Sequence, residues 1–148
     1  MVVNGDSLLI SGPIKRMFDQ KQYEHGVSHG LSEAGYDIRV KQPIVLNKDK
    51  RFMIASAIEE FSMPDDLMGI VHDKSTWARR GLSVFNTVIE PGWKGFLTLE
   101  LVYHGPGELN IFPGSGIAQV IFHKVTDPMA YKGRYQNQED RPVEAIAS

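Results

Sequence analysis

The 148-residue sequence contains no cysteine. A chain without cysteine has no disulfide framework, no thiolate nucleophile and no cysteine-ligated zinc site. It also has no apolar run that approaches the roughly 20 residues a membrane-spanning helix needs. We therefore expect no membrane segment and no membrane partner.

The sequence also has no excess of basic residues. Lysine and arginine number 16 against 18 aspartates and glutamates, which gives a formal net charge of -2. This balance argues against nucleic acid as a partner, because a polyanion binder needs a basic surface. Basic residues gather at Lys74, Arg79 and Arg80, beside Ser75 and Thr76. That cluster is either a local anion site or a solvated surface.

The N-terminal segment has no basic leader before its apolar stretch and no small-residue cleavage site. We therefore expect no secretory signal and a cytoplasmic location. The length and the absence of repeats or linkers predict a single domain over residues 1–148. Within it we expect an N-terminal helical or loop segment over residues 1–34, with an amphipathic helix at 13–22, and a C-terminal tail over 126–148.

From Tyr36 onward the sequence consists of short alternating or apolar runs separated by turn signals such as MPDD, HGPGE and FPGSG. The runs are YDIRV, PIVLN, RFMIAS, LMGIVH, LSVFN, FLTLELVY, ELNIF and IAQVIFHKV. This pattern is typical of many short strands and predicts an all-β barrel or sandwich with one or two short helices. Because such a sheet has exposed edges, we also expect a homo-oligomer.

The run from Phe96 to Tyr103 carries the first candidate catalytic residue. Its period of two places Leu97, Leu99 and Leu101 on one face and leaves Glu100 on the other, among apolar neighbours. Burial raises the pKa of a carboxyl group toward the range that suits proton transfer, so Glu100 is a candidate general base. The alternative is a carboxylate that faces solvent or forms a structural ion pair.

Two segments before this strand add polar chemistry. In TVIEPGWKG, Gly92 and Gly95 flank Trp93, and glycines there permit close backbone approach to a ligand, although an ordinary hairpin turn explains them equally well. In HDKSTWARRGL, hydroxyl groups, backbone amides and cations are suited to a polyphosphate. The tripeptide KST is not a P-loop, because the preceding GxxxxG is missing.

Four segments together, in order and spacing, resemble the signature segments of dCTP deaminases and their bifunctional deaminase/diphosphatase relatives. They are HDKSTWARRGL, NTVIEPGWKGFLTLEL, PGSGIAQVIF and YKGRYQNQ, and GYDIRV resembles the family's early strand. The resemblance covers residues 35–138 and points to the superfamily that unites dCTP deaminases with dUTP diphosphatases. It implies a distorted β-barrel that forms homotrimers with active sites at subunit interfaces.

The resemblance also implies roles for single residues. Glu100 corresponds to the glutamate that activates a water for attack on C4 of cytosine. Ser75 and Arg79 correspond to residues that bind phosphate and orient that water and the glutamate. Lys74 stands where the family has arginine, which keeps the charge but loses the bidentate fork. Thr76 belongs to the same polyphosphate segment.

The remaining expected contacts with the nucleotide lie in two stretches. Main-chain atoms around Asn86, Thr87 and Val88 are expected near the base, in a segment about two residues shorter than is typical of the deaminases; a plain strand end is the alternative. The tail is expected to close as a lid over the triphosphate and sugar. Its matching residues are Tyr131, Arg134, Tyr135 and Gln138, and Trp93 and Glu90 complete the set of expected substrate contacts.

The resemblance implies Mg²⁺ that arrives with the triphosphate, and no zinc, since the HxE and PCxxC pattern of zinc deaminases is absent. His25 and His29 are expected to be structural or surface residues in a glycine-rich loop, so no metal ligands are predicted. Two other functions stay open. One is dUTP hydrolysis, alone or after deamination, with Glu90 in place of the usual aspartate and without the family's glycine-rich arm. The other is non-catalytic nucleotide binding.

Overall fold

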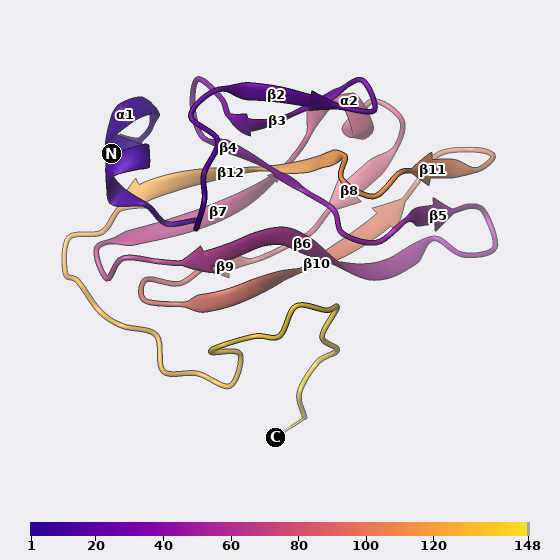
Figure 1. Ribbon diagram of the computed structural model, residues 1–148. Helices are drawn as coiled ribbons and strands as arrows, with labels where there is room; N and C mark the ends of the chain where they lie inside the picture. The colour runs from indigo at the N-terminus through magenta and orange to yellow at the C-terminus, as the bar shows by residue number, and fades with distance from the viewer. Residues whose placement is uncertain (148) are drawn as a thin grey trace.

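The computed structural model of the protein, which describes residues 1–147, is built almost entirely of strands (Figure 1). Two short helices, α1 (Gly5–Ser11) and α2 (Ser75–Ala78), accompany them. The strands are β1 (Val2–Val3), β2 (Lys21–Glu24), β3 (Val27–Leu31), β4 (Tyr36–Arg39), β5 (Ile44–Leu46), β6 (Phe52–Ser62), β7 (Leu67–Asp73), β8 (Leu82–Val84), β9 (Val88–Ile89), β10 (Lys94–Tyr103), β11 (Leu109–Ile111) and β12 (Gly116–Lys124). The predicted all-β class is confirmed.

The strands form two facing layers and a small arm. A 7-stranded antiparallel sheet has the order β2-β3-β4-β12-β7-β9, with β1 also paired to β12. A 3-stranded sheet, β6-β10-β8, lies beneath β12 and β7 in Figure 1. A bridge between Val40 and Ala57 joins the two layers, and β5 pairs with β11 in the projecting arm. The result is a distorted barrel, as expected.

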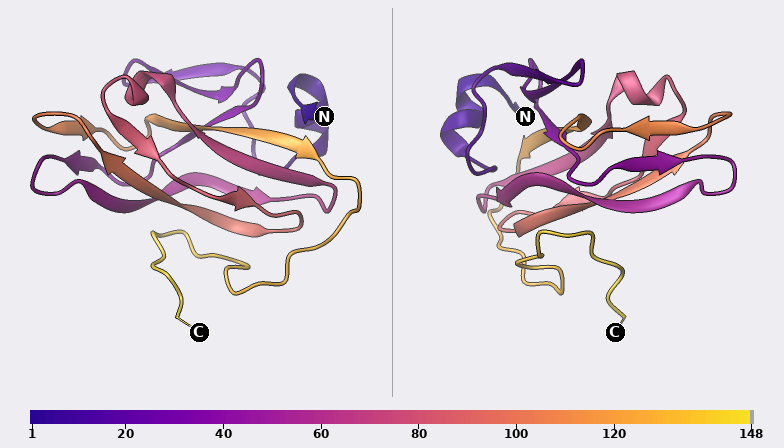
Figure 2. Two further views of the ribbon diagram at one scale, coloured as in Figure 1. Left: turned by 180° about the vertical axis from the view of Figure 1, so that it is seen from behind. Right: turned by 45° about the vertical axis from the view of Figure 1, so that its right-hand side comes forward.

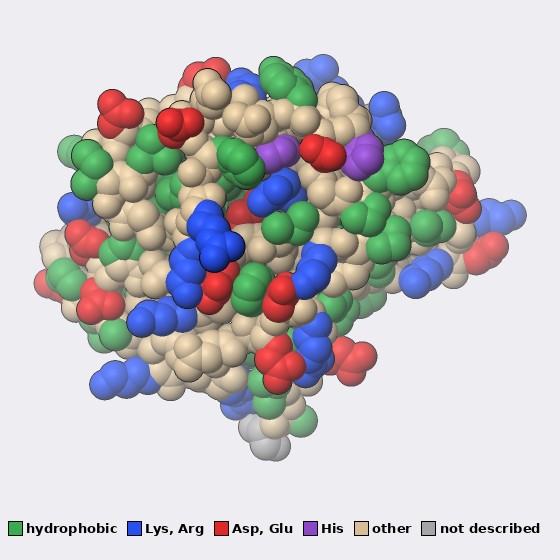
Figure 3. All heavy atoms as spheres, in the orientation of Figure 1, with side chains coloured by type: hydrophobic (Ala, Val, Ile, Leu, Met, Phe, Trp, Pro, Cys, Tyr) green, Lys and Arg blue, Asp and Glu red, His purple; other side chains and the backbone are tan. Residues whose placement is uncertain are grey.

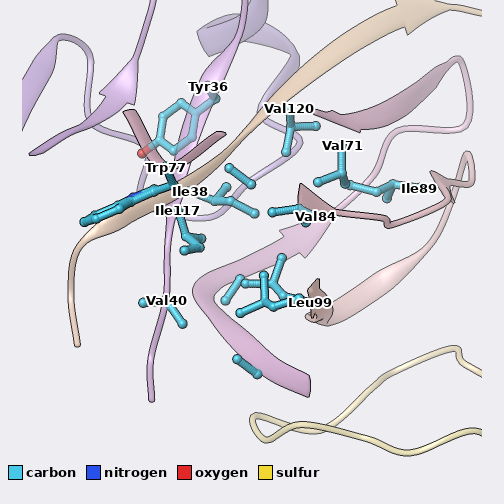
Figure 4. Close-up of a cluster of buried hydrophobic side chains, with 14 of the residues drawn as sticks. Tyr36, Ile38, Val40, Val71, Trp77, Val84, Ile89, Leu99, Ile117 and Val120 are labelled. Carbon is cyan, nitrogen blue, oxygen red and sulfur yellow. The ribbon is translucent and has the colours of Figure 1, made fainter. Parts of the chain in front are cut away.

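The hydrophobic core fills the space between the two layers (Figure 4). Alternation along β4 directs Tyr36 and Ile38 into it, and alternation along β10 directs Leu99 and Leu101 into it from the other side. Each of these side chains is at most 1% exposed. Because period two fixes which residues of β10 point inward, Glu100 must point to the opposite face of that strand.

The predicted helix over residues 13–22 is wrong. The only helix before β2 is α1, which ends at Gly12 in the left-handed conformation (φ 60) that commonly terminates helices. Beyond it, Ile14 forms an antiparallel bridge with Phe61, and Arg16 has a φ of 57, which no helix contains. The segment is irregular: it buries Ile14 against β6 and leaves Met17 and Phe18 half-buried.

Two further details of the strands differ from expectation. The glycine-rich HGVSHG segment is not a loop, since β2 and β3 form a hairpin there and place His29 at 4% exposure. The strand predicted at residues 51–56 continues as β6 to Ser62, because β10 pairs with it along its length. In both places pairing with a neighbouring strand overrides the local sequence signal.

Residues 125–147 run as an extended segment without regular helix or strand and return beneath β9 and β10 (Figures 1 and 2). Acidic and basic side chains are interspersed over the face seen in Figure 3. No helix among residues 1–147 has the length and apolar character to cross a membrane.

Candidate active site

A cavity of about 530 Å³ lies between β10, the segment before β9 and the C-terminal tail. Its volume falls in the range of small-molecule sites. It brings together nine of the residues that the sequence singled out: Asn86, Thr87, Val88, Glu90, Trp93, Glu100, Tyr131, Tyr135 and Gln138. Residues separated by more than 50 positions in the chain thus meet around one space.

Glu100 is the chemically distinctive group of this cavity. Its side chain projects from β10 on the face opposite the core, and its Oε2 atom is buried with no hydrogen-bond partner among residues 1–147. Removal from water raises the pKa of the Glu100 carboxyl above its ordinary value, although a hydrogen bond to its own backbone opposes the shift. A desolvated, unpaired carboxylate beside a cavity is a competent proton acceptor.

The segment between β8 and β9 forms the wall next to Glu100. Thr87, Val88 and Glu90 are exposed and line the cavity. The Asn86 side chain behaves differently, because Nδ2 donates to the Thr98 carbonyl (2.8 Å) and Oδ1 accepts from the Glu100 amide (2.9 Å). The Asn86 carboxamide is therefore bound to β10.

The C-terminal tail forms the opposite wall and is attached to the turn before β10 by several hydrogen bonds. Trp93 Nε1 donates to the Tyr135 carbonyl (2.7 Å), and the Phe96 amide donates to the Gln138 carbonyl (3.0 Å). Gln138 Nε2 donates to the hydroxyl group of Thr98 (2.8 Å), which lies two residues before Glu100 in the chain. The tail thus reaches the middle of β10.

The two glycines around Trp93 make room for this tail. A Cβ atom on Gly95 would lie 2.5 Å from the Gln138 amide nitrogen, and one on Gly92 would lie 2.8 Å from the Ala130 Cα. Sequence reasoning expected close approach of the backbone to a ligand. The structure shows close approach to the chain's own C-terminal segment.

Arg134 lies outside the cavity lining. Its Nη1 donates to the Ile146 carbonyl (2.7 Å), and the Tyr135 hydroxyl accepts from the Ile146 amide (3.1 Å). These two contacts fold the tail back on itself. Phosphate binding by Arg134 stays a prediction.

The α2 segment is not brought to the cavity within one chain. It lies on the side of the molecule away from the tail (Figures 1 and 2). Ser75, Thr76 and Arg79 are exposed there, and none of them lines the cavity. Lys74 is 10% exposed and its Nζ binds Asp37 (2.7 Å) and the Ser28 hydroxyl (3.0 Å). Lys74 thus has a structural partner, and its contact with phosphate stays a prediction.

The charged residues that line the cavity are all acidic. Three glutamates, at positions 90, 100 and 144, line it, and no lysine or arginine is among its lining residues. A polyphosphate placed there meets no cation from the same chain's cavity wall. Residues 1–147 contain no group of three or more histidine, aspartate or glutamate side chains able to hold a metal ion.

Sequence reasoning missed eight residues of the lining. Three of them, Ile89, Leu97 and Thr98, lie within the segment NTVIEPGWKGFLTLEL but were not assigned a contact with the nucleotide. Phe52 and Ile54 come from β6, where they stand opposite Val102 and Glu100 of β10. Only the cross-strand register reveals them, and no local signal gives that register. The other three, Val143, Glu144 and Ala145, follow the segment of recognised motifs, and their one sequence signal is membership of the tail expected to act as a lid.

Comparison with known sequences supports the resemblance. A family model described as dCTP deaminase-like matches residues 12–125. A dCTP deaminase of Acidobacterium capsulatum is 32% identical over 94% of this chain and 96% of its own length. A dCTP deaminase of Campylobacter curvus is 35% identical over 82% of this chain and 84% of its own length.

Solved structures similar to this chain include dUTPases. The native EIAV dUTPase has a TM-score of 0.58 at 20% identity and covers 77% of this chain and 90% of its own. A variant dUTPase of Staphylococcus bacteriophage 80alpha with dUpNHpp has a TM-score of 0.60 at 16% identity, covering 82% and 94%. At these identities the likeness shows the fold alone.

Proposed function

Because the chain belongs to the dCTP deaminase-like family, we propose that it is a hydrolase that converts dCTP and water to dUTP and ammonia. The observation that carries this proposal is the half-buried Glu100 side chain, whose Oε2 atom is buried without a hydrogen-bond partner beside a cavity large enough for a nucleotide. A stable fold gains nothing from an unpaired buried acid, so its presence favours a chemical role.

In the proposed reaction Glu100 takes a proton from a water molecule as the water oxygen forms a bond to C4 of cytosine. C4 becomes tetrahedral as the electrons of its double bond move to N3, and N3 receives the proton from Glu100. Glu100 then takes the proton of the new C4 hydroxyl group and passes it to the 4-amino nitrogen, so that the exocyclic C4–N bond breaks, ammonia leaves and a carbonyl group forms at C4. A carboxyl group with a raised pKa suits both halves of this transfer, since it must accept the proton and release it again.

We propose a homotrimer in which the α2 segment of a neighbouring copy completes the cavity. Two observations support this arrangement: the cavity wall has glutamates but no cation, and Ser75 and Arg79 are exposed on another part of the molecule. The exposed aromatic pair Phe52 and Phe85, with ring centroids 6.0 Å apart, also offers apolar surface beside the cavity for a second copy to cover.

Mg²⁺ is expected to enter with the nucleotide, because it prefers phosphate and water oxygens as ligands. It would neutralise part of the triphosphate charge in a cavity that is itself acidic. The proposed enzyme acts in deoxyribonucleotide metabolism in the cytoplasm.

A second candidate is dUTP hydrolysis to dUMP and pyrophosphate at the same cavity, alone or after deamination. The observation that favours it is Glu90, which lines the cavity together with Glu100. A carboxylate there could orient a water toward the phosphate chain. Its extra methylene relative to aspartate shifts the carboxylate from the position that this family uses.

The test is a product assay with dCTP and, separately, dUTP in the presence of Mg²⁺, using the wild type, Glu100→Gln and Glu90→Gln. We expect dUTP and ammonia from dCTP, with a loss of about 10²–10⁴-fold in Glu100→Gln. Full activity of Glu100→Gln would sink the deaminase mechanism. Formation of dUMP that depends on Glu90 would establish the hydrolase, and nucleotide binding without any turnover would leave a non-catalytic binder.

A further inference from the structure

The two hydrogen bonds of Asn86 replace two bonds of a β-ladder. Strand β8 pairs with β10 in the register Val84↔Leu101 and Leu82↔Tyr103. The Phe85 amide still donates to the Glu100 carbonyl (3.1 Å), which continues that register by one residue. In a regular antiparallel pair the Glu100 amide would then donate to the Phe85 carbonyl, and the Thr87 amide to the Thr98 carbonyl.

Neither of these bonds forms. The Glu100 amide donates to Asn86 Oδ1 (2.9 Å), and the Thr98 carbonyl accepts from Asn86 Nδ2 (2.8 Å). A side-chain amide has the same kinds of donor and acceptor as a peptide group. It therefore satisfies the β10 backbone groups at the point where the main chain after β8 no longer pairs with β10. Within residues 1–147 the Phe85 carbonyl and the Thr87 amide then have no protein partner.

We propose that Asn86 is a positioning residue for Glu100. Its carboxamide holds the backbone of β10 on both sides of Leu99 and so fixes the point from which the Glu100 side chain projects. It also lets the main chain of residues 85–87 separate from β10, and this separation opens the wall of the cavity beside the carboxylate. The Asn86 side chain is thereby occupied and is not itself a ligand of the base.

This inference rests on the proposed deamination for its kinetic test. In Asn86→Ala we expect kcat for dCTP to fall about 10²-fold, the cost of a small misplacement of a catalytic group, with a much smaller change in KM. Asn86→Asp keeps the acceptor for the Glu100 amide but sets an oxygen against the Thr98 carbonyl, and kcat should fall there too. Asn86→Asp provides the same kinetic test if Asn86→Ala does not fold.

Asn47→Ala is the matched control. Asn47 is also half-buried, and its Oδ1 accepts hydrogen bonds from the Asp49 and Lys50 amides (2.9 Å each), but it does not line the cavity. We expect this variant to lose stability and keep its kcat. An unchanged kcat in both Asn86 variants would overturn the proposal, and a rise in KM alone would make Asn86 a ligand of the base.

A second measurement separates this inference from the proposed function. Hydrogen exchange at the Glu100 amide needs no turnover and reports the bond to Asn86 directly. We expect exchange there to be roughly tenfold faster in Asn86→Ala than in the wild type and unchanged in Asn47→Ala. If the wild type does not deaminate dCTP, the proposed function fails. The exchange measurement still shows whether Asn86 binds the Glu100 amide. Unaltered exchange at Glu100 in Asn86→Ala would refute it.

Discussion

At the scale of single residues, two glutamates show how a buried carboxylate can serve structure or chemistry. Burial raises the pKa of both Glu59 and Glu100 above the ordinary glutamate value. Glu59 accepts hydrogen bonds from Arg39, through Nε (2.8 Å) and the backbone amide (2.9 Å). Glu100 has a buried oxygen with no partner. The raised pKa alone does not distinguish them, and the presence of a partner does.

This contrast predicts opposite effects of two matched substitutions on stability. The folded state raises the Glu100 pKa, so it favours the protonated carboxyl and is destabilised once the pH rises through that pKa. Glu100→Gln should therefore unfold about 2–4 °C above the wild type near neutral pH. The gain should vanish below the pKa of an unfolded glutamate, about 4.3. Thermal unfolding followed across pH measures this difference.

Glu59→Gln is the matched control for that measurement. The glutamine amide keeps one acceptor oxygen but sets its NH2 group against the second Arg39 donor, a clash that a protonated carboxyl group avoids. The free energy of unfolding should therefore fall by roughly 1.5–3 kcal/mol near neutral pH. If Glu100→Gln were also less stable than the wild type near neutral pH, Glu100 would be a structural residue and its proposed catalytic role would lose its main support.

The sequence predicts some of these residue environments and not others. The period of β10 is enough to place Glu100 on the face opposite the buried leucines, because alternation is a local property. The environment of Lys74 could not be predicted from the sequence. Its partner Asp37 lies 37 positions earlier in the chain, so sequence alone presents Lys74 as a free cation beside Ser75.

At the scale of elements, long runs with clear period two are predicted well and the N-terminal segment is not. Strands β10 and β12 appear where alternation predicts them, since each has a partner on both sides. Residues 13–22 have apolar spacing that suits a helix, yet Ile14 binds to the edge of β6 instead. Tertiary pairing decides such ambiguous segments, and the partner of Ile14, Phe61, lies 47 positions later in the chain.

The attachment of the tail to β10 depends on the absence of a side chain at Gly95. Its φ of 137 and the Gln138 nitrogen, 2.5 Å from the position of a Cβ, both oppose any substitution. In Gly95→Ala we expect the tail to separate from β10, because the new Cβ atom would overlap the Gln138 backbone. KM for dCTP should rise about tenfold or more, and limited proteolysis should cut after β12 faster than in the wild type.

Gly107→Ala controls for backbone strain in that experiment. Gly107 also has a left-handed φ (71), but a Cβ there meets nothing within 4 Å. Both variants should lose about 1–3 kcal/mol of stability from the strained backbone. If Gly107→Ala raised KM and proteolysis to the same extent, the effect at Gly95 would be one of general stability and the tail would have no special part in binding.

At the scale of the whole molecule, the charges suited to a nucleotide are divided between two sides. The acidic cavity with Glu100 is lined by the tail. The exposed cation Arg79 directly follows α2, and Figure 1 shows α2 on the side of the molecule away from the tail. One chain therefore does not present Glu100, the proposed proton-transfer group, together with Arg79, the proposed phosphate ligand. A symmetric assembly can join them, since each copy then offers Glu100 to one neighbour and Arg79 to the other.

This division predicts complementation between two inactive variants. Glu100→Gln and Arg79→Ala should each lose most deaminase activity alone. After unfolding and refolding at equal concentration, about a quarter of the interfaces should unite an intact Glu100 of one copy with an intact Arg79 of the next. Activity should then return to about a quarter of the wild-type value per site.

Activity that returned only to the average of the two separate variants would place both residues in one chain's site. Refolding each variant by itself controls for damage from the procedure, and sedimentation of the mixture establishes the number of copies. Recovery that requires both partners and scales with the fraction of mixed oligomers would arise only from a site shared between copies, because neither chain carries an intact pair of its own.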